Sequence, residues 1–243
     1  MKTALITGAS SGIGRACAIK LAQNGYAVAI NYAKNDAKAE EVKKEIIDGG
    51  GNAELFKADV TKLAEVKKLM KDVVKTFGGL DLLVNNAGVA EVGYLLMISE
   101  ESINKSFDLN VKGYFYCAQQ AALKMLPKKK GVIINMSSVS ASHALNGQSV
   151  YASTKGAVNS MTLSLAKEFA EKGIRVNAVA PGFVRTEMLN PIPETVKNGY
   201  LKDIPMHRFA EPDEVAELVC MLASDKLAYM TGQIITIDGG MTL

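Results

Sequence analysis

The chain has 243 residues, of which 48% are hydrophobic, and its 28 basic and 25 acidic side chains give a formal net charge of +3. This length fits one large α/β domain, and the charge balance argues against a protein that binds nucleic acid or a membrane surface. Cys17, Cys117 and Cys220 are odd in number and far apart, so neither a disulfide framework nor a metal-binding spacing is expected. The apolar runs are too short for a signal sequence or a membrane span, so we expect a cytoplasmic protein.

Short runs rich in β-branched residues alternate with longer helical stretches along the whole chain. The strands are expected at residues 4–7, 27–32, 53–57, 80–85, 131–136, 175–179 and 233–237. The helices are expected at residues 13–24, 36–48, 63–77, 100–126, 152–172 and 212–223. Most strands are almost continuously apolar, which is typical of strands that are covered on both faces. The alternation predicts a parallel sheet of about seven strands with helices on both sides.

One segment, residues 185–208, interrupts this alternation after the sixth strand. It contains Pro191, Pro193, Gly199 and Pro205, and the composition predicts irregular structure. Long insertions at such places often cover a binding site, so we expect this segment to be a substrate lid.

A glycine-rich turn follows the first strand, where Gly8, Gly12 and Gly14 form the pattern G-x-x-x-G-x-G. Glycine allows a close approach of the backbone to a ligand, and the helix that follows directs free N–H groups and a positive dipole end at the turn. Such a turn suits a pyrophosphate. A tight turn without a ligand is the alternative.

The end of the second strand, Asn31-Tyr32-Ala33-Lys34-Asn35, bears on the choice of nucleotide. In many dinucleotide-binding folds an acidic residue here binds the ribose hydroxyls of NAD. No carboxylate is present at this strand end, and Asp36 is expected to cap the next helix. Because Arg15 and Lys34 are available as cations, we predict that NADP(H) is preferred over NAD(H).

Tyr151 and Lys155 are four residues apart, so both lie on one face of the same predicted helix. A free phenol has a pKa of about 10, and a fixed ammonium beside it favours the phenolate. The pair suits proton transfer near neutral pH, although this spacing is also common on solvated helices.

Further polar residues are expected at the same sheet edge as this pair. Ser137 and Ser138 end the fifth strand, Asn85 and Asn86 end the fourth, and Asn110 lies in the helix that follows. Ligands bind at the carboxyl edge of open α/β sheets, so these side chains are expected to meet in one crevice.

Taken together, these motifs and Pro181-Gly182 resemble the short-chain dehydrogenase/reductase family in order and spacing over essentially the whole chain. Within it, the chain is most similar to the 3-oxoacyl-acyl-carrier-protein reductases of fatty acid biosynthesis. Asp59-Val60, residues 204–212 and the ending Asp238-Gly239-Gly240-Met241 carry this finer resemblance. The family resemblance implies a single Rossmann-like, doubly wound domain over residues 1–243.

The resemblance implies that the enzyme reduces a ketone with NADPH, most plausibly a 3-oxoacyl thioester to the 3-hydroxyacyl thioester. Tyr151 then gives a proton to the carbonyl oxygen, and Ser138, rather than Ser137, binds that oxygen. Lys155 lowers the pKa of Tyr151 and holds the nicotinamide ribose, while Asn110 orders a water that relays protons to Lys155.

The same resemblance implies the residues that hold the cofactor, with the glycine-rich turn at the phosphates, Asp59 and Val60 at the adenine, and Asn86 along the adenosine ribose. The full set is Gly8, Ser10, Ser11, Gly12, Ile13, Gly14, Arg15, Lys34, Asp59, Val60, Asn86, Gly88, Tyr151, Lys155 and Val184.

Several other residues have an ordinary structural explanation beside a functional one. His143 and His207 are interpreted as an exposed loop residue and a packing residue, without metal-binding partners. The basic run 128–130 is interpreted as a solvated turn, and the alternative is that Lys129 and Lys172 dock an acidic acyl carrier protein.

Methionines 97, 188 and 206 either line the lid and pocket or pack in the core. The helical segments 100–126 and 152–172 correspond to subunit contacts in the family, so a homotetramer is expected.

The segment 89–99 departs from the pattern of the acyl-carrier-protein reductases, which usually have a Thr-Arg-Asp type of sequence here and a basic residue near position 97. Another carbonyl, steroid, sugar or acetoacetyl-CoA substrate therefore stays open. A non-catalytic nucleotide-sensing relative on the same fold is a further alternative.

Overall fold

The computed structural model describes residues 1–190 and 192–243. Within these residues, seven parallel strands form one sheet in the order β3-β2-β1-β4-β5-β6-β7. The strands are β1 (Lys2–Ile6), β2 (Tyr26–Tyr32), β3 (Asn52–Lys57), β4 (Leu82–Asn85), β5 (Gly131–Met136), β6 (Ile174–Pro181) and β7 (Ile234–Ile237). The order reverses direction between β1 and β4, which confirms the doubly wound α/β class expected from the sequence.

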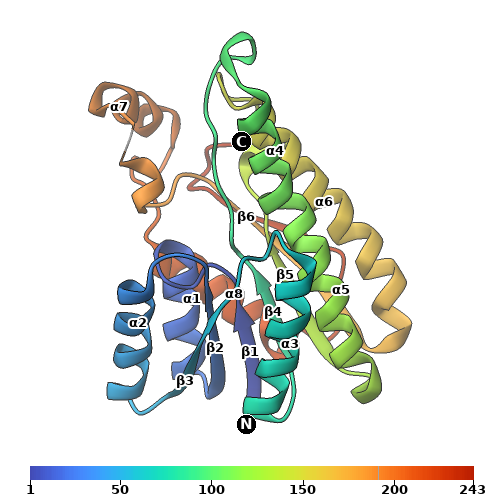
Figure 1. Ribbon diagram of the computed structural model, residues 1–243. Helices are drawn as coiled ribbons and strands as arrows, with labels where there is room; N and C mark the ends of the chain where they lie inside the picture. Colours follow the sequence, from blue (N-terminus) through green and yellow to red (C-terminus); the bar gives the residue numbers. More distant parts are fainter. Residues whose placement is uncertain (191) are drawn as a thin grey trace.

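Helices cover both faces of the sheet, with α1, α2 and α8 on one side and α3, α5 and α6 on the other (Figure 1). Their bounds are α1 (Gly12–Gln23), α2 (Asp36–Asp48), α3 (Leu63–Phe77), α4 (Glu100–Phe107), α5 (Gly113–Met125), α6 (Ser149–Phe169), α7 (Glu194–Asp203) and α8 (Pro212–Ala223). None of the described helices is both long and apolar enough to cross a membrane.

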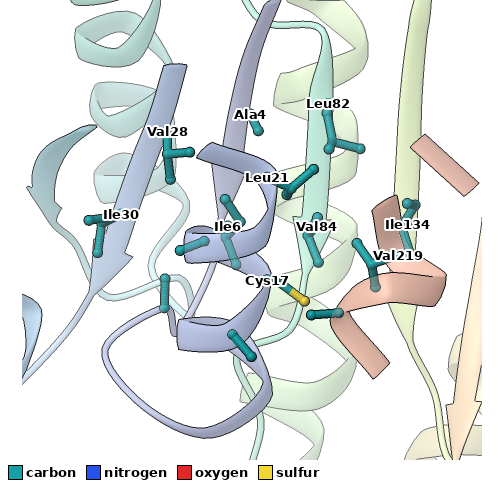
Figure 2. Close-up of a cluster of buried hydrophobic side chains, with 14 of the residues drawn as sticks. Ala4, Ile6, Cys17, Leu21, Val28, Ile30, Leu82, Val84, Ile134 and Val219 are labelled. Carbon is teal, nitrogen blue, oxygen red and sulfur yellow. The ribbon is translucent and has the colours of Figure 1, made fainter. Parts of the chain in front are cut away.

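Two hydrophobic cores lie on opposite faces of the sheet, because successive side chains of a strand point to opposite sides. In β1, Ile6 belongs to the core under α1 and α8, whereas its neighbour Leu5 belongs to the core under α3 and α5. Figure 2 shows the first core, in which Cys17 and Leu21 of α1 meet Val219 of α8 over the strands. The continuous apolar runs in the sequence reflect this double burial.

Two expectations about the helices need correction. The segment 100–126 is helical as expected but not α-helical throughout, because a π-helical turn, Asp108–Lys112, lies between α4 and α5. The insertion 185–208 is not irregular, because it contains α7. Its prolines suggested a chain break, yet Pro193 is the N-cap residue of α7, where the missing N–H group costs no hydrogen bond within the helix. Pro191 lies outside the described residues.

The two edges of the sheet differ in what they carry. The glycine-rich turn, the β4 and β5 ends and the start of α6 lie at the carboxyl edge, where α7 also lies (Figure 1). Lys129 and Lys172 lie at the amino edge, just before β5 and β6. They are neighbours there, because a Cβ atom on Gly173 would stand 2.0 Å from the Lys129 carbonyl oxygen. The basic residues and the crevice are therefore at opposite ends of the sheet in one chain.

Candidate active site

A cavity of about 870 Å³ opens at the carboxyl edge of the sheet. Its walls come from the ends of β1, β2, β4, β5 and β6, from the start of α6 and from the insertion. The predicted site residues that line it are Gly8, Ser10, Ser11, Gly12, Ile13, Asp59, Val60, Asn86, Gly88, Ser138, Tyr151, Lys155 and Val184. Most of the residues that the sequence predicted for the site thus line the cavity.

The glycine-rich turn is shaped by close backbone contacts. Gly8 and Gly12 have φ values of 63° and 54°, in the left-handed region that favours glycine. A Cβ atom on Gly14 would lie 2.3 Å from the Gly8 carbonyl oxygen and 2.5 Å from the amide nitrogen of Asn86. Gly14 therefore lets α1 approach the turn, although it does not itself line the cavity.

Asn86 fastens this turn to the fourth strand. Its Nδ2 donates to the carbonyl oxygens of Thr7 and Gly8 at 2.9 and 3.2 Å, and the backbone N–H groups of Asn86 and Ala87 donate to the Thr7 hydroxyl. These hydrogen bonds give Asn86 a structural role in the turn, and its contact with a ribose stays a prediction. Thr7 was not among the predicted site residues, and its place before Gly8 was the available signal.

The beginning of α1 provides a fit for an anionic cofactor. Ser11 is its N-cap residue, yet its side chain makes no capping hydrogen bond, and the first turn of α1 holds no acidic residue. Within this described part of the chain, the free N–H groups and the positive end of the helix dipole thus lack a side-chain partner at the cavity wall. A pyrophosphate group fits such a wall.

The two cations expected near the end of β2 do not line the cavity. Asn31, Ala33 and Asp59 line the cavity, whereas Lys34 and Arg15 are exposed and lie outside its wall. Arg15 forms an ion pair with Glu45 of α2.

Asp36 at the start of α2 turns toward β3 rather than toward the cavity. Its carboxylate binds Lys57 at 2.8 Å, and the hydrogen bonds from Lys57 and Tyr32 lower its pKa. No carboxylate from the end of β2 is thus seen among the described residues that line the cavity.

Lys155 is 3% exposed, and its ammonium donates to the Met136 carbonyl oxygen at 2.8 Å. The ammonium lies 5.7 Å from the centre of the Tyr151 ring. Burial disfavours the charged form and lowers the pKa of Lys155 to about 7. This lysine therefore changes charge within the working range of most enzymes.

Tyr151 and Ser138 face each other across the cavity. Burial raises the pKa of Tyr151, and a hydrogen bond with Ser138 partly offsets this. The direction of the pKa shift is the reverse of the sequence-based expectation, because removal of the phenol from water outweighs the hydrogen bond with Ser138. A phenol with a raised pKa keeps its proton at neutral pH and is a proton donor.

Ser138 belongs to a short chain of hydroxyl and amide groups. Its Oγ accepts from the Ser140 N–H at 3.1 Å, and the Ser140 hydroxyl donates to Oε1 of Gln148 at 2.7 Å. Ser137 instead donates to Oδ1 of Asn159 at 2.6 Å, so its hydroxyl is engaged with α6. The geometry favours Ser138 over Ser137 as the partner of a bound oxygen.

Asn110 is fully buried in the π-helical turn and does not line the cavity. Its Oδ1 accepts from the Val89 N–H at 2.9 Å, and its Nδ2 donates to the Val89 carbonyl oxygen and to Thr154 at 2.8 and 3.1 Å. The side chain therefore fixes the cavity wall at Val89 and the helix that carries Tyr151. The predicted role in ordering a water is untested.

Sequence reasoning did not identify several residues of the cavity wall. Leu145, Gln148 and the insertion residues Thr186, Glu187 and Tyr200 all line it. For Gln148, the signal was its position three residues before Tyr151. The three methionines differ in location. Met188 lines the cavity, whereas Met97 and Met206 lie outside its wall and are 82% and 59% exposed.

The two histidines take no part in the cavity wall. His143 is half-buried beside the cavity, and His207 lies exposed at the end of the insertion, with Nδ1 3.3 Å from the Leu201 carbonyl oxygen.

Doubly wound sheets of this kind bind dinucleotides across the crevice at their carboxyl edge. The fold, together with a tyrosine and a buried lysine in that crevice, defines an NAD(P)-dependent oxidoreductase. The family model described as "Enoyl-(Acyl carrier protein) reductase" matches residues 8–242. The chain belongs to the short-chain dehydrogenase/reductase family.

Similar proteins cover nearly the whole chain. A 3-oxoacyl-acyl-carrier-protein reductase from Staphylococcus epidermidis is 44% identical over 240 residues, which are 99% of this chain and 98% of that protein. The enzyme of the same name from Thermotoga maritima is 39% identical over 242 residues, 100% of this chain and 98% of that protein. Among solved structures, a mutant of a short-chain dehydrogenase/reductase from Serratia marcescens is 34% identical, with a TM-score of 0.95 and coverage of 100% and 98%.

Proposed function

We propose that the protein reduces the ketone of a 3-oxoacyl thioester, carried by an acyl carrier protein, to a secondary alcohol with NADPH. The observation that carries the proposal is the pair of half-buried Tyr151 and buried Lys155 beside Ser138 in the 870 Å³ cavity. Relatives that are 39–45% identical over the full chain bear the name of that activity, which supports the choice of substrate.

The bound cofactor supplies the hydride, and the protein supplies the proton and the positions. The Tyr151 hydroxyl donates its proton to the carbonyl oxygen, which becomes the alcohol oxygen. Ser138, held by the Ser140 backbone N–H, presents its hydroxyl to the same oxygen. Two hydroxyl donors on one oxygen stabilise the negative charge that develops there, and this suits a C=O bond better than the C=C bond of an enoyl substrate.

Lys155 and Asn110 support this step from behind the tyrosine. The Lys155 ammonium favours the phenolate that Tyr151 becomes after it has donated its proton, and it is the group available for the nicotinamide ribose. Asn110 holds the cavity wall at Val89 from the π-helical turn.

Replacing Tyr151 with Phe tests the proton donor. We expect turnover of acetoacetyl thioester to fall about 10²–10⁴-fold, because a general acid contributes an effect of that size. The dissociation constant of NADPH stays unchanged, and Tyr229→Phe, a change at a fully exposed tyrosine, is the matched control. A variant that keeps turnover within threefold of the parent would exclude this role.

A substrate panel separates the proposed activity from its alternatives. Acetoacetyl thioester on acyl carrier protein is expected to react faster than crotonyl thioester, a small ketone, a sugar or a steroid, when NADPH oxidation is followed. Faster reduction of crotonyl thioester would point to an enoyl reductase instead. No turnover with any substrate would favour the nucleotide-sensing alternative.

We propose NADPH rather than NADH as the physiological cofactor. The support is the Asp36 carboxylate, which is held by Lys57 outside the cavity, together with Lys34 next to the wall residue Ala33. A carboxylate at the wall would repel a 2′-phosphate, whereas a nearby ammonium attracts it. We expect kcat/KM at least tenfold higher with NADPH, and an equal or reversed preference would overturn the assignment.

The insertion 185–208 is proposed as the substrate lid of the single domain 1–243. Its residues Leu189, Val196 and Tyr200 line the cavity, and the Tyr200 ring stacks on Phe183 with centroids 4.2 Å apart. These apolar groups suit an acyl chain.

Lys129 and Lys172 are proposed to dock the acidic carrier. Because they lie at the amino edge of the sheet, we propose that the carrier delivers its substrate to the cavity of a neighbouring subunit. This fits the proposed homotetramer, since Phe115 of α5 and Leu163 of α6 are half-exposed apolar residues.

A cytoplasmic location is proposed on the buried thiols of Cys17 and Cys117, where burial raises the pKa of Cys117 to about 12.

A further inference from the structure

A second phenol, Tyr114 of α5, lies behind the catalytic pair. It is 1% exposed and ranks among the largest fully buried side chains of the protein. The centre of its ring is 5.3 Å from the Lys155 ammonium, slightly nearer than that of Tyr151 at 5.7 Å. The ammonium is therefore flanked by two aromatic rings, one at the cavity and one in the interior.

Tyr114 and Lys155 also share one acceptor. The Met136 carbonyl oxygen at the end of β5 receives the Lys155 ammonium at 2.8 Å and the Tyr114 hydroxyl at 3.2 Å. The Tyr114 backbone carbonyl receives Nδ2 of Asn85 at 3.3 Å, so α5 is fastened to β4 at this residue. The Tyr114 ring thus cannot turn away from the lysine without breaking its buried hydrogen bond to Met136.

An ammonium that is buried in this place has lost most of its hydration, and contacts with the protein must replace the lost interactions with water. One carbonyl oxygen satisfies only one of its three N–H donors. The face of an aromatic ring within about 6 Å attracts a cation, and the attraction is strongest where water is excluded. The Tyr114 ring meets both conditions on the side of Lys155 that faces the interior.

We propose that Tyr114 is a positioning residue for Lys155. The Tyr114 ring holds the Lys155 ammonium in its charged form beside Tyr151. The hydroxyl of Tyr114 fixes the Met136 carbonyl and has a smaller effect. This inference rests on the proposed function, because the charge of Lys155 matters to the reaction only if Tyr151 donates the proton.

The surroundings of Lys155 leave few other groups to set its charge. The titratable groups that face it are Tyr151 from its own helix and Tyr114 from α5, and Cys117 lies one turn further along α5 against Tyr114. The group from β5 that contacts the ammonium, the Met136 carbonyl, is neutral. Burial raises the pKa values of Tyr114 and Cys117, so both are uncharged at working pH.

Two substitutions separate the ring from the hydroxyl. Tyr114→Phe keeps the ring and the volume, and Tyr114→Leu removes the ring. We expect the alkaline limb of the kcat–pH profile to stay in place for the Phe variant and to move about one pH unit lower for the Leu variant. At pH values above this limb, the turnover of the Leu variant is then about tenfold lower than that of the parent. Tyr116→Leu, a half-buried ring lost from the same helix, is the matched control and leaves the limb in place.

A direct measurement of the protonation of Lys155 tests the proposal independently of turnover. The rate at which acetic anhydride acylates Lys155, followed by peptide mass spectrometry against pH, reports the protonation midpoint of this side chain. The midpoint should fall by about one unit in Tyr114→Leu and remain at the parental value in Tyr114→Phe. If the Leu variant is poorly folded by circular dichroism, Tyr114→Met, an unbranched replacement, takes its place.

A double-mutant cycle completes the test. In a Lys155→Met background, Tyr114→Leu should leave the residual kcat unchanged, because its effect acts through the lysine. Equal acylation midpoints in the parent and the ring-less variant, or an additive loss in the double mutant, would overturn the proposal. Absence of ketone reduction by the parent would reject the proposed function instead, and the acylation midpoints would still report on Tyr114.

Discussion

Replacement of Lys155 with Met should stabilise the fold while it abolishes efficient catalysis. The lysine is 3% exposed, and its pKa falls from 10.5 to about 7 because its charge is buried. At about 1.4 kcal/mol for each pKa unit, this fall corresponds to about 5 kcal/mol of lost stability when the lysine is charged. Methionine fills a similar volume without a charge.

Part of this gain is lost again with the hydrogen bond to Met136. The bond is worth about 1–3 kcal/mol, and the carbonyl oxygen keeps the Tyr114 hydroxyl as its donor. The expected net stabilisation is therefore about 2–4 kcal/mol at pH 6.

The pH dependence gives the prediction its sign. Below about pH 7 the folded and unfolded states both bind the proton, and the parent carries the full cost of the buried charge. Between pH 7 and 10.5 only the unfolded state keeps the proton, so this lysine makes the parental free energy of unfolding rise with pH. The advantage of the Met variant thus shrinks as pH increases and disappears near pH 10.5.

Urea denaturation of both proteins at pH 6, 8 and 9.5, at matched protein concentration, measures the difference. The Tyr151→Phe variant is a useful control, since it alters the neighbouring side chain without removing the lysine. A Met variant less stable than the parent at pH 6, or a stability difference that does not change with pH, would refute the reasoning.

The other predictions concern residues outside the cavity wall. Gly14→Ala places a methyl group 2.3 Å from the Gly8 carbonyl oxygen, so NADPH affinity measured by fluorescence titration should fall more than tenfold, and unchanged affinity would contradict the assigned packing. Asn110→Ala leaves the Val89 N–H and carbonyl groups without their partner, which should lower the free energy of unfolding by about 2–3 kcal/mol in urea. A loss below about 0.5 kcal/mol would show that Asn110 does not hold this wall.

Much of the fold follows from periodicity and turn residues. The β5 strand and the α2, α3 and α8 helices have the bounds predicted from the sequence, because apolar runs between glycine and polar turns leave little choice of register. The site was predictable to the same degree at Gly8, Ser138 and Tyr151, since each residue lies where a strand ends or a helix begins.

The remainder depends on contacts that no local pattern contains. Nothing in the sequence distinguishes Tyr114 from an ordinary core tyrosine. Only the packing of α5 against β5 brings its phenol to Lys155. The ion pair of Arg15, which the sequence offered to the nucleotide, with Glu45 of α2 is a second such contact. The direction of the Tyr151 pKa likewise depends on its burial, which the spacing of Tyr151 and Lys155 does not reveal.

The π-helical turn at Asp108–Lys112 means that the run from α4 to α5 counts one residue more than an unbroken α-helix of the same turns. One residue corresponds to about 100° of rotation, so the two halves of this run are out of phase. Deleting a single residue here would restore regular pitch and rotate the whole of α5 about its axis, which would carry Tyr114 away from Lys155. Relatives that differ by one residue in this turn should therefore differ in which side chain lies behind their lysine, whatever identity the rest of the alignment shows.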